Sequence, residues 1–172
     1  MKIILILIFL IPCTALANDW DALEQDGAIA IMRHALAPGT GDPSDFDLRD
    51  CSTQRNLDER GRAQARSIGA AFRDRGIKFD LVYTSQWCRT RETAELLAAG
   101  PVIEAPSLNS FFRDRANRDR QTAATRELIG DTDGRLMLVT HQVNISGLTG
   151  RGTRSGEVLI IRAAAGSVEV LG

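Results

Sequence analysis

Two histidines and an arginine stand where two apolar runs of this sequence end. The first run, Ile29 to Met32, ends in Arg33-His34, and the second, Leu136 to Thr140, ends in His141; the sequence contains no other histidine. Short apolar runs bounded by glycine and proline are typical of buried strands. Ligands of open α/β sheets bind beyond the carboxyl ends of the strands, so we expect both imidazoles at one sheet edge if the two strands are parallel neighbours. The first run alone leaves open an ordinary strand end that reaches solvent.

A further cation, Arg89, lies in the first turns of a predicted helix. That helix opens within Ser85 to Ala94 and follows a predicted strand from Phe79 to Thr84. The N-terminus of a helix offers free N–H groups and a positive dipole end, both of which favour an anion such as phosphate. The guanidinium fork of Arg89 suits phosphate oxygens as well. Arg91, in contrast, is expected to pair with Glu95 one turn further along the helix.

The segment between the first histidine and this helix is predicted to be a long loop followed by a helix. Residues 35–55 are rich in Pro, Gly and Asp, which is typical of a functional loop. Asn56 is expected to cap a helix that runs to about Arg75, with Glu59 completing a capping box and Gly76 just past the end. Its buried stripe is expected at Ala65, Ile68, Gly69 and Phe72, and its solvated face at Arg60, Arg62, Arg66 and Arg73.

The second half of the sequence predicts two more helices and a closing hairpin. One helix is expected over 117–130, with Ala124, Leu128 and Ile129 buried, and another begins at Gln142, whose first N–H groups could face a phosphate. Residues 158–161 and 168–171 predict the hairpin. The glycines between 147 and 156 follow no predicted strand, so they do not form a dinucleotide fingerprint. The alternation of strands and helices predicts a three-layer α/β/α sandwich with a mixed, mainly parallel central sheet.

The N-terminus has the pattern of a secretory signal peptide. Lys2 precedes an apolar run that ends at Ile11 and is too short to span a bilayer, and Ala15-Leu16-Ala17 forms a small-residue cleavage site. We therefore expect cleavage after Ala17, a single domain over 18–172, a periplasmic or secreted protein and no stable membrane anchor.

Charge and cysteine content narrow the class of protein further. The formal net charge of −1 argues against a nucleic-acid partner held by bulk charge. After cleavage only Cys51 and Cys88 remain, and export would allow them to form a disulfide, with two separate buried thiols as the alternative. Because cysteine and histidine nowhere form a close-spaced ligand pair, neither a metal site nor a cofactor is expected.

Four segments of the sequence, in this order, resemble the histidine phosphatase superfamily, the phosphoglycerate-mutase-like fold. They are Arg33-His34-Ala35, residues 56–65, residues 85–94 and Val139-Thr140-His141, so that the resemblance covers 18–172 almost end to end. The sequence is similar in particular to short exported members of the phosphohistidine phosphatase type.

The resemblance implies a set of roles for these residues. His34 would be the nucleophile that forms a phosphohistidine. Arg33, Arg89 and His141, with Gln142 beside them, would bind the phosphoryl oxygens and stabilise the transferring group. The carbonyl of a nearby loop glycine would hold the other ring nitrogen of His34, and no metal would be needed.

The sequence departs from the family at the general acid. Many members place a carboxylate shortly after a leucine in the segment that corresponds to Leu108–Phe112, where this sequence has Asn109 and Ser110. Loss of a general acid costs about 10²–10⁴-fold in rate for a poor leaving group. Asp114 is a possible substitute, although an ion pair with a neighbouring arginine is its alternative role, and Glu104 is the next carboxylate upstream. A phosphoramidate, with its good leaving group, would need less help.

Three functions are compatible with these observations. The first is hydrolysis of a phosphomonoester or phosphoramidate on a small molecule or a phosphoprotein. The second is a catalytically weak protein that binds phosphorylated ligands. The third is a phosphatase for envelope sugar phosphates such as a lipopolysaccharide heptose phosphate. The oligomeric state has no signature in the sequence.

Overall fold

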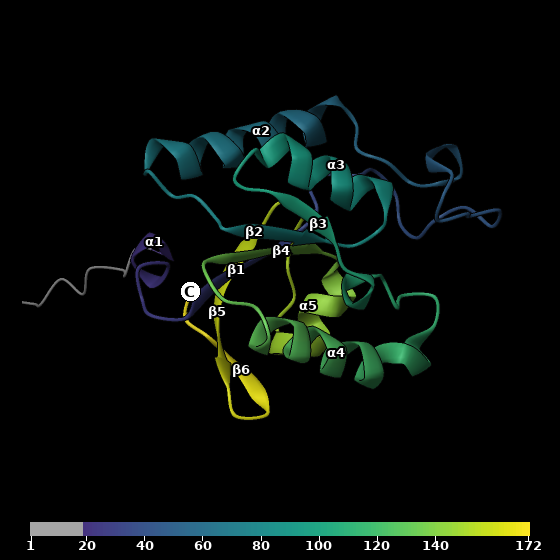
Figure 1. Cartoon of the computed structure of the whole chain (residues 1–172). Helices are drawn as coiled ribbons and strands as arrows, with labels where there is room; N and C mark the ends of the chain where they lie inside the picture. The colour runs from purple at the N-terminus through teal and green to yellow at the C-terminus, as the bar shows by residue number, and fades with distance from the viewer. Residues whose placement is uncertain (1–18) are drawn as a thin grey trace, which may run out of the picture.

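A six-stranded sheet forms the centre of the fold, which a computed structural model describes for residues 19–172 (Figure 1). The strand order is β3-β2-β4-β1-β5-β6. Strands β3, β2, β4 and β1 run parallel, whereas β5 is antiparallel to β1 and β6 to β5. The strands are β1 (Ala28–Arg33), β2 (Leu81–Thr84), β3 (Val102–Glu104), β4 (Leu136–Thr140), β5 (Val158–Ala164) and β6 (Ser167–Val170). The prediction of a mixed, mainly parallel sheet is confirmed.

Helices cover both faces of this sheet. Helices α2 (Glu59–Asp74) and α3 (Cys88–Leu97) lie on one face, and α4 (Arg118–Gly130) and α5 (Gln142–Thr149) lie on the other (Figure 1). The short α1 (Asp19–Ala22) precedes β1, and single 3-10 turns occur at Cys51–Thr53, Pro106–Leu108 and Arg115–Asn117. The molecule is therefore the predicted three-layer α/β/α sandwich.

Alternation along β1 divides the core between the two helical layers. Ala28, Ala30 and Met32 pack with Phe72 of α2 in one cluster, while Ile29 and Ile31 pack into the other. Successive side chains of a strand point to opposite faces. Because both faces are covered, the whole strand is apolar until Arg33, its first residue that is not fully buried.

The N-terminus of α2 differs from the prediction. Asp58, not Asn56, is the N-cap, and its carboxylate accepts a hydrogen bond from the backbone N–H of Gly61 at 2.8 Å. The side chain of Asn56 instead donates to the carbonyl of Cys51. The expectation of a cap at Asn56 was wrong because an aspartate two residues later also suits that position.

Two glycines of α2 allow close approach of neighbouring backbone. A Cβ at Gly61 would lie 2.0 Å from the carbonyl oxygen of Leu36, and one at Gly69 would lie 2.0 Å from that of Leu97. Gly61 therefore sets α2 against the chain just after His34, and Gly69 sets α2 against the end of α3. The predicted stripe of Ala65, Gly69 and Phe72 is buried, and Ile68 is partly buried beside it.

Several boundaries and buried positions also differ from the sequence prediction. Strand β2 begins at Leu81 rather than Phe79, and the edge strand β3 was not predicted. Helix α4 buries Thr122 and Thr125 with Ile129, whereas Ala124 and Leu128 are only partly buried. The hairpin of β5 and β6 and the helix that begins at Gln142 are confirmed.

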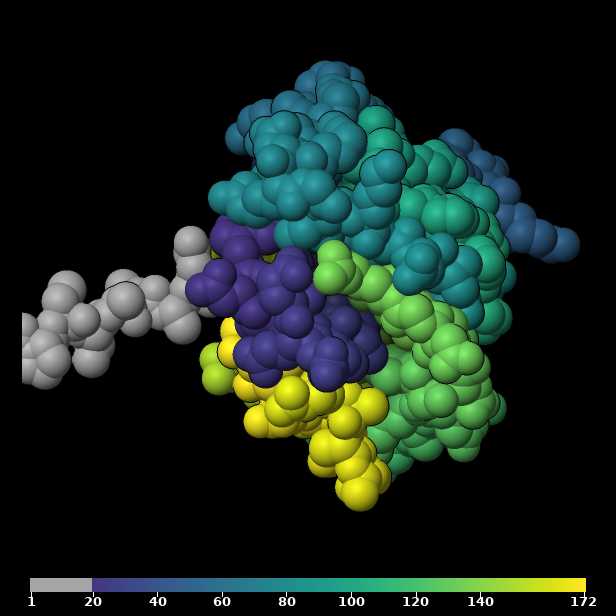
Figure 2. Space-filling model, turned by 60° about the vertical axis from the view of Figure 1, so that its left-hand side comes forward, coloured from purple at the N-terminus to yellow at the C-terminus, as the bar shows by residue number. Residues whose placement is uncertain are grey.

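The two ends of the described chain lie on the same side of the molecule. Trp20 and Leu171 pack against the same core cluster, and Figure 2 shows the first described residues beside the closing hairpin. The predicted signal peptide, 1–17, lies outside the described residues. None of the helices from residue 19 onward is long and apolar enough to cross a membrane.

Candidate active site

The two histidines meet at one edge of the sheet. Arg33 of β1 pairs in register with Thr140 of β4, so the residues that follow each of them, His34 and His141, emerge side by side. Their ring centroids are 5.5 Å apart, and the two side chains are 2% and 4% exposed. The prediction that both imidazoles share one edge is confirmed, and the alternative of a solvent-exposed strand end is wrong.

His34 is held in one tautomer by the residue after it. Its Nδ1 lies 2.7 Å from the carbonyl oxygen of Ala35. A carbonyl only accepts, so Nδ1 carries the proton and Nε2 keeps a free lone pair. The Ala35 N–H in turn donates to Thr93 of α3, and the Leu36 N–H donates to Gln64 of α2. The carbonyl partner is therefore that of Ala35 rather than that of a loop glycine, and the helices of one layer hold it.

The surroundings of His34 keep its ring neutral. Burial lowers its pKa from 6.5 to about 3, and the positive charges of Arg89, Arg55 and Arg33 act in the same direction, against the hydrogen bond to Ala35. A neutral imidazole with a free Nε2 is the nucleophilic form.

Whereas His34 is held through Nδ1, His141 is held through Nε2. Its Nε2 lies 2.8 Å from Ser85 Oγ, and Ser85 contacts Thr90 Oγ1 at 2.8 Å. Its Nδ1 lies 3.4 Å from Nη2 of Arg89, which can only donate. In the neutral ring Nε2–H therefore donates to Ser85, and Nδ1 accepts from Arg89. Burial, followed by the charge of Arg89, lowers the pKa of His141 well below its ordinary value.

Arg89 is bound by a carboxylate that the sequence reasoning missed. Its Nη1 lies 2.6 Å from Oδ1 of Asp42 and its Nη2 lies 3.2 Å from Oδ2, and both side chains are buried. Trp87 Nε1 donates to the same carboxylate at 3.1 Å. The sequence offered no signal for Asp42, because it is one of several aspartates in a loop without periodicity.

Arg33 and Arg89 each carry an unpaired donor. Arg33 Nη1 donates to the carbonyl of Thr153 at 2.9 Å. Among the described residues the buried Nε atoms of both arginines have no hydrogen-bond partner. An unsatisfied buried donor is costly, so these two N–H groups are suited to an anionic ligand. The predicted grouping of Arg33, Arg89 and His141 around His34 is present.

These residues line a cavity of about 520 Å³. Gln142 at the start of α5 lines it, as does Arg55, a second residue that the sequence reasoning missed. Arg55 Nε donates to the carbonyl of Gly41 at 2.9 Å, and its Nη1 contacts the carbonyl of Ala37. Three exposed arginines also line the cavity: Arg113 and Arg115 in the segment before α4, and Arg118 at the first residue of that helix.

The two carboxylates considered as substitutes for the missing acid do not line this cavity. Asp114 is exposed and accepts a hydrogen bond from Asn117 rather than forming the expected ion pair with an arginine. Glu104 pairs with Arg91 at 3.2 Å, so Arg91 does not bind Glu95 as expected. Asn109 exchanges two hydrogen bonds with Gln86, and Ser110 lies in the cavity wall.

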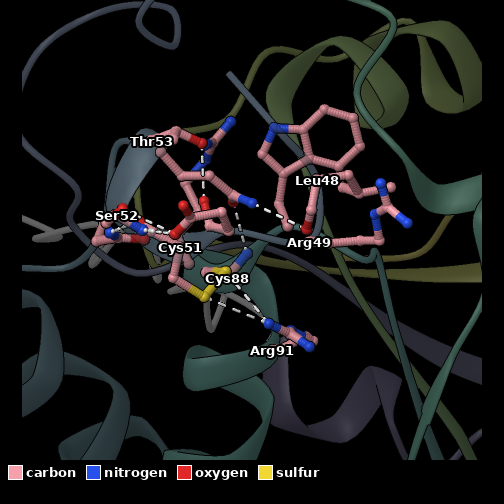
Figure 3. Close-up of a disulfide and its surroundings, with 12 residues drawn as sticks. Leu48, Arg49, Cys51, Ser52, Thr53, Cys88 and Arg91 are labelled. Carbon is pink, nitrogen blue, oxygen red and sulfur yellow. Dashed lines mark hydrogen bonds between the residues drawn. A yellow bond between two sulfur atoms is a disulfide. The ribbon is translucent and has the colours of Figure 1, made fainter. Parts of the chain in front are cut away.

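A disulfide joins the long loop to the helix that carries Arg89. Cys51 and Cys88 are bonded, with Cα atoms 5.7 Å apart, as expected from the sequence. Arg91 lies beside both sulfur atoms (Figure 3), and Gln54 accepts a hydrogen bond from the N–H of Cys88. The bond fixes the first residue of α3, next to Arg89. No three His, Cys, Asp or Glu side chains within 19–172 converge into a group that could hold a metal ion.

Comparison with known proteins finds similar sequences among phosphatases and phosphoglycerate mutases. The sequence profile of the histidine phosphatase superfamily, branch 1, matches residues 29–112. A 2,3-bisphosphoglycerate-dependent phosphoglycerate mutase of Rhizobium meliloti (strain 1021) is 30% identical over 126 residues, which cover 70% of this chain and 54% of the relative. A mitochondrial serine/threonine-protein phosphatase, Pgam5 of Drosophila willistoni, is 41% identical over 52 residues, 30% of this chain and 18% of its own length. The chain thus spans about half of the mutase and less of Pgam5.

Solved structures share the fold at low sequence identity. A phosphoserine phosphatase from Entamoeba histolytica, in complex with 3-phosphoglyceric acid, has a TM-score of 0.61 at 12% identity, covering 84% of this chain and 95% of its own. The protein histidine phosphatase SixA, in complex with tungstate, has a TM-score of 0.58 at 15% identity, covering 83% and 93%. Residues 29–112 thus match the sequence profile of the histidine phosphatase superfamily, and the shared sandwich and the paired strand-end histidines are compatible with that match.

Proposed function

We propose that this protein is a phosphatase that hydrolyses a phosphomonoester or phosphoramidate through a phosphohistidine on His34. The observation that carries the proposal is the hydrogen bond from His34 Nδ1 to Ala35, which leaves Nε2 unprotonated in a cavity rich in arginine. Attack of this lone pair on phosphorus forms the N–P bond as the leaving group departs, and water then cleaves that bond. The Nδ1–H···O contact persists and offsets the positive charge that the ring acquires.

Arg33 and Arg89 would stabilise the transferring group. Their unpaired Nε–H donors suit the equatorial phosphoryl oxygens, and preorganised donors of this kind can lower a barrier by several kcal/mol. His141 would bind the same group through Nδ1. That nitrogen must then carry a proton, so the dianionic phosphoryl group would have to raise the low pKa of His141.

Substitution of His34 tests the proposal. His34→Ala should abolish turnover of an aryl phosphate, and His141→Ala should cut the rate severely without preventing slow phosphoenzyme formation. Rapid quenching followed by mass spectrometry should find an acid-labile phosphoryl group on His34 of the wild type. Substantial turnover by His34→Ala would overturn the assignment. A wild type that binds tungstate but releases no phosphate would favour a catalytically weak binding protein.

The charge of the cavity supports a substrate with more than one anionic group. Within the described part of the chain, six arginines line it, against the single carboxylate of Asp42. Arg113, Arg115 and Arg118 form no ion pair within 19–172. A phosphorylated envelope sugar that bears further anionic groups would suit them, as would other small molecules of this class. We keep such a sugar phosphate as the second candidate substrate.

Export is part of the proposal. The signal peptide pattern in 1–17 supports a periplasmic or secreted enzyme, and the Cys51–Cys88 bond is compatible with an oxidising compartment. The mature protein should then begin at Asn18. N-terminal sequencing of the protein from a periplasmic or culture-medium fraction would test this, and an intact Met1 on the fractionated protein would contradict it.

A further inference from the structure

Among residues 19–172, Asp42 is the single carboxylate that lines the cavity. Hydrogen bonds from three residues besides Arg89 fix its position. The backbone N–H of Arg55 donates to Oδ1 at 3.3 Å and Trp87 Nε1 donates to Oδ2 at 3.1 Å, while Arg113 holds the Asp42 carbonyl at 2.9 Å. Burying a charged carboxylate costs free energy. A loop carboxylate that is buried and anchored through both its backbone and its side chain is therefore a candidate for a functional role.

The carboxylate is also close to the reacting centre. Nη2 of Arg89 contacts Oδ2 of Asp42 and Nδ1 of His141, and the His141 ring packs against that of His34. The chain Asp42, Arg89, His141 and His34 is therefore contiguous. A phosphoryl group on His34 Nε2 would lie within this cluster.

We propose that Asp42 is the general acid that the segment Leu108–Phe112 lacks. The inference rests on the proposed phosphohistidine mechanism and adds a proton donor to it. In the resting protein the Asp42 carboxylate is the counterion of Arg89. The incoming phosphoryl oxygens bind the unpaired Nε–H of Arg89 and compete with Asp42 for its Nη groups, so Asp42 loses its cation and faces an anion.

This exchange at Arg89 favours protonation of Asp42. Burial by itself raises the pKa of Asp42, but the hydrogen bonds and charge of Arg89, together with the weaker effects of the hydrogen bonds from Trp87 and the Arg55 N–H, outweigh burial and hold that pKa below its ordinary value. Once Arg89 turns to the phosphoryl group, burial and the neighbouring dianion act in the same direction and raise it. The contacts to Trp87 and to the Arg55 N–H do not depend on Arg89, so the carboxyl stays in the cavity.

The substrate itself supplies the proton that Asp42 donates to the leaving group. A phosphomonoester has a second pKa of about 6, so its monoanion brings a proton that passes to Asp42. As the His34 Nε2–P bond forms and the P–O bond breaks, Asp42 returns this proton to the leaving oxygen, which departs as an alcohol. The Asp42 carboxylate then accepts a proton from the water that attacks the phosphohistidine.

A leaving-group series tests the proposal. The rate of phosphoenzyme formation on His34 would be measured by rapid quench for aryl phosphates of rising leaving-group pKa and for one sugar phosphate, with wild type, Asp42→Asn and two controls. The controls are Asp45→Asn, an exposed carboxylate on the same loop, and Asp114→Asn. Asparagine keeps a hydrogen-bonding oxygen but has no proton to donate. Tungstate binding monitors the integrity of the site in each variant.

Asp42→Asn should slow the poorest leaving groups by about 10²–10⁴-fold and the most reactive aryl phosphates by little, which steepens the dependence of log k on leaving-group pKa. Both controls should keep the wild-type slope. An equal loss for every leaving group would show that Asp42 only positions Arg89, and a gain in rate would show that it only competes with the phosphoryl group; either result overturns the proposal. Absence of phospho-His34 in the wild type would instead refute the phosphohistidine mechanism.

Discussion

Protonation of His34 couples the stability of the protein to pH. The folded protein lowers the pKa of His34 to about 3 through burial and the charge of Arg89, whereas a histidine of an unfolded chain has a pKa of about 6.5. Between these values the unfolded chain binds the extra proton, so the stabilisation is complete above about pH 6.5 and decreases as the pH falls towards 3. We expect the free energy of unfolding to fall by about 3 kcal/mol between pH 7 and pH 4 from His34 alone.

Urea unfolding at a series of pH values would measure this loss. His141 contributes in the same direction, because burial lowers its pKa as well. The matched variant is His34→Gln, which cannot titrate in this range and should show a flatter pH dependence than the wild type. Equal slopes for the two proteins would mean that His34 is charged, or exposed, in the folded state.

Individual site residues differed in how far the sequence could reveal them. His34, Arg33 and His141 follow apolar runs directly, so the pattern of the strands placed them at one edge. Asp42 and Arg55 belong to a loop whose path is set by contacts with distant residues, such as the hydrogen bonds from Arg113 to the carbonyls of Asp42 and Pro43. No local pattern encodes a contact of that kind. Asp114 was misplaced because closeness in sequence to the family's acid position does not fix the direction of a side chain.

The disulfide ties the loop after His34 to the first residue of α3. Cys51 and Cys88 are 37 residues apart, and closure of a loop of this size contributes on the order of 4 kcal/mol in the chain-entropy account. Reduction should therefore lower the melting temperature. It should also weaken tungstate binding, because Arg89 and Asp42 lie on the two segments that the bond joins.

Calorimetry with and without a reductant would check this expectation. The double variant Cys51→Ser/Cys88→Ser serves as the control, since its melting temperature should resemble that of the reduced wild type and should not respond to the reductant. If two free thiols titrate in the denatured, unreduced protein, Cys51 and Cys88 are not bonded and the expectation is wrong.

The start of α2 offers a paired test of helix capping. Asp58→Ala should destabilise the protein by about 1 kcal/mol, because the Gly61 N–H loses its acceptor. Asn56→Ala leaves this cap in place and removes only the contact of a partly buried side chain with the Cys51 carbonyl, so it should cost less. Chemical denaturation of both variants would decide between the two positions, and a larger loss for Asn56→Ala would contradict the assignment.

Elements with a strong periodic pattern were predictable, and elements formed by the context were not. The stripe of α2 and the apolar runs of β1 and β4 gave their type and approximate ends. Strand β3 is only three residues long, exposed throughout, and exists because β2 offers it a partner. The buried threonines of α4 were missed because a search for apolar periodicity counts threonine as polar. Thr125 can nevertheless be buried, since its hydroxyl group donates to the carbonyls of Ser107 and Gln121.

At the scale of the whole molecule, six arginines within residues 19–172 line one cavity of a protein whose net charge is −1. Arg118→Gln should therefore lower kcat/KM for a substrate with a second phosphate by about 2–5-fold, the magnitude of an exposed ion pair, and leave p-nitrophenyl phosphate nearly unchanged. Arg120→Gln, two residues further along α4 and outside the cavity wall, is the matched control. The same fractional loss on both substrates would indicate general attraction of anions rather than a contact with the second group.

The pairing of β1 with β4 has a consequence for how the protein acquires its activity. Ala30 pairs with Met137, so the strands that carry the two histidines are far apart in the chain and their contact is of high contact order, which slows folding. The anion site consequently arises only with the long-range sheet and is absent from the unfolded chain. A ligand such as phosphate then binds the native state alone, and by mass action its whole binding free energy adds to stability. In the export proposed above, the chain would fold outside the cytoplasm, and phosphate present there would act as a thermodynamic aid to its maturation.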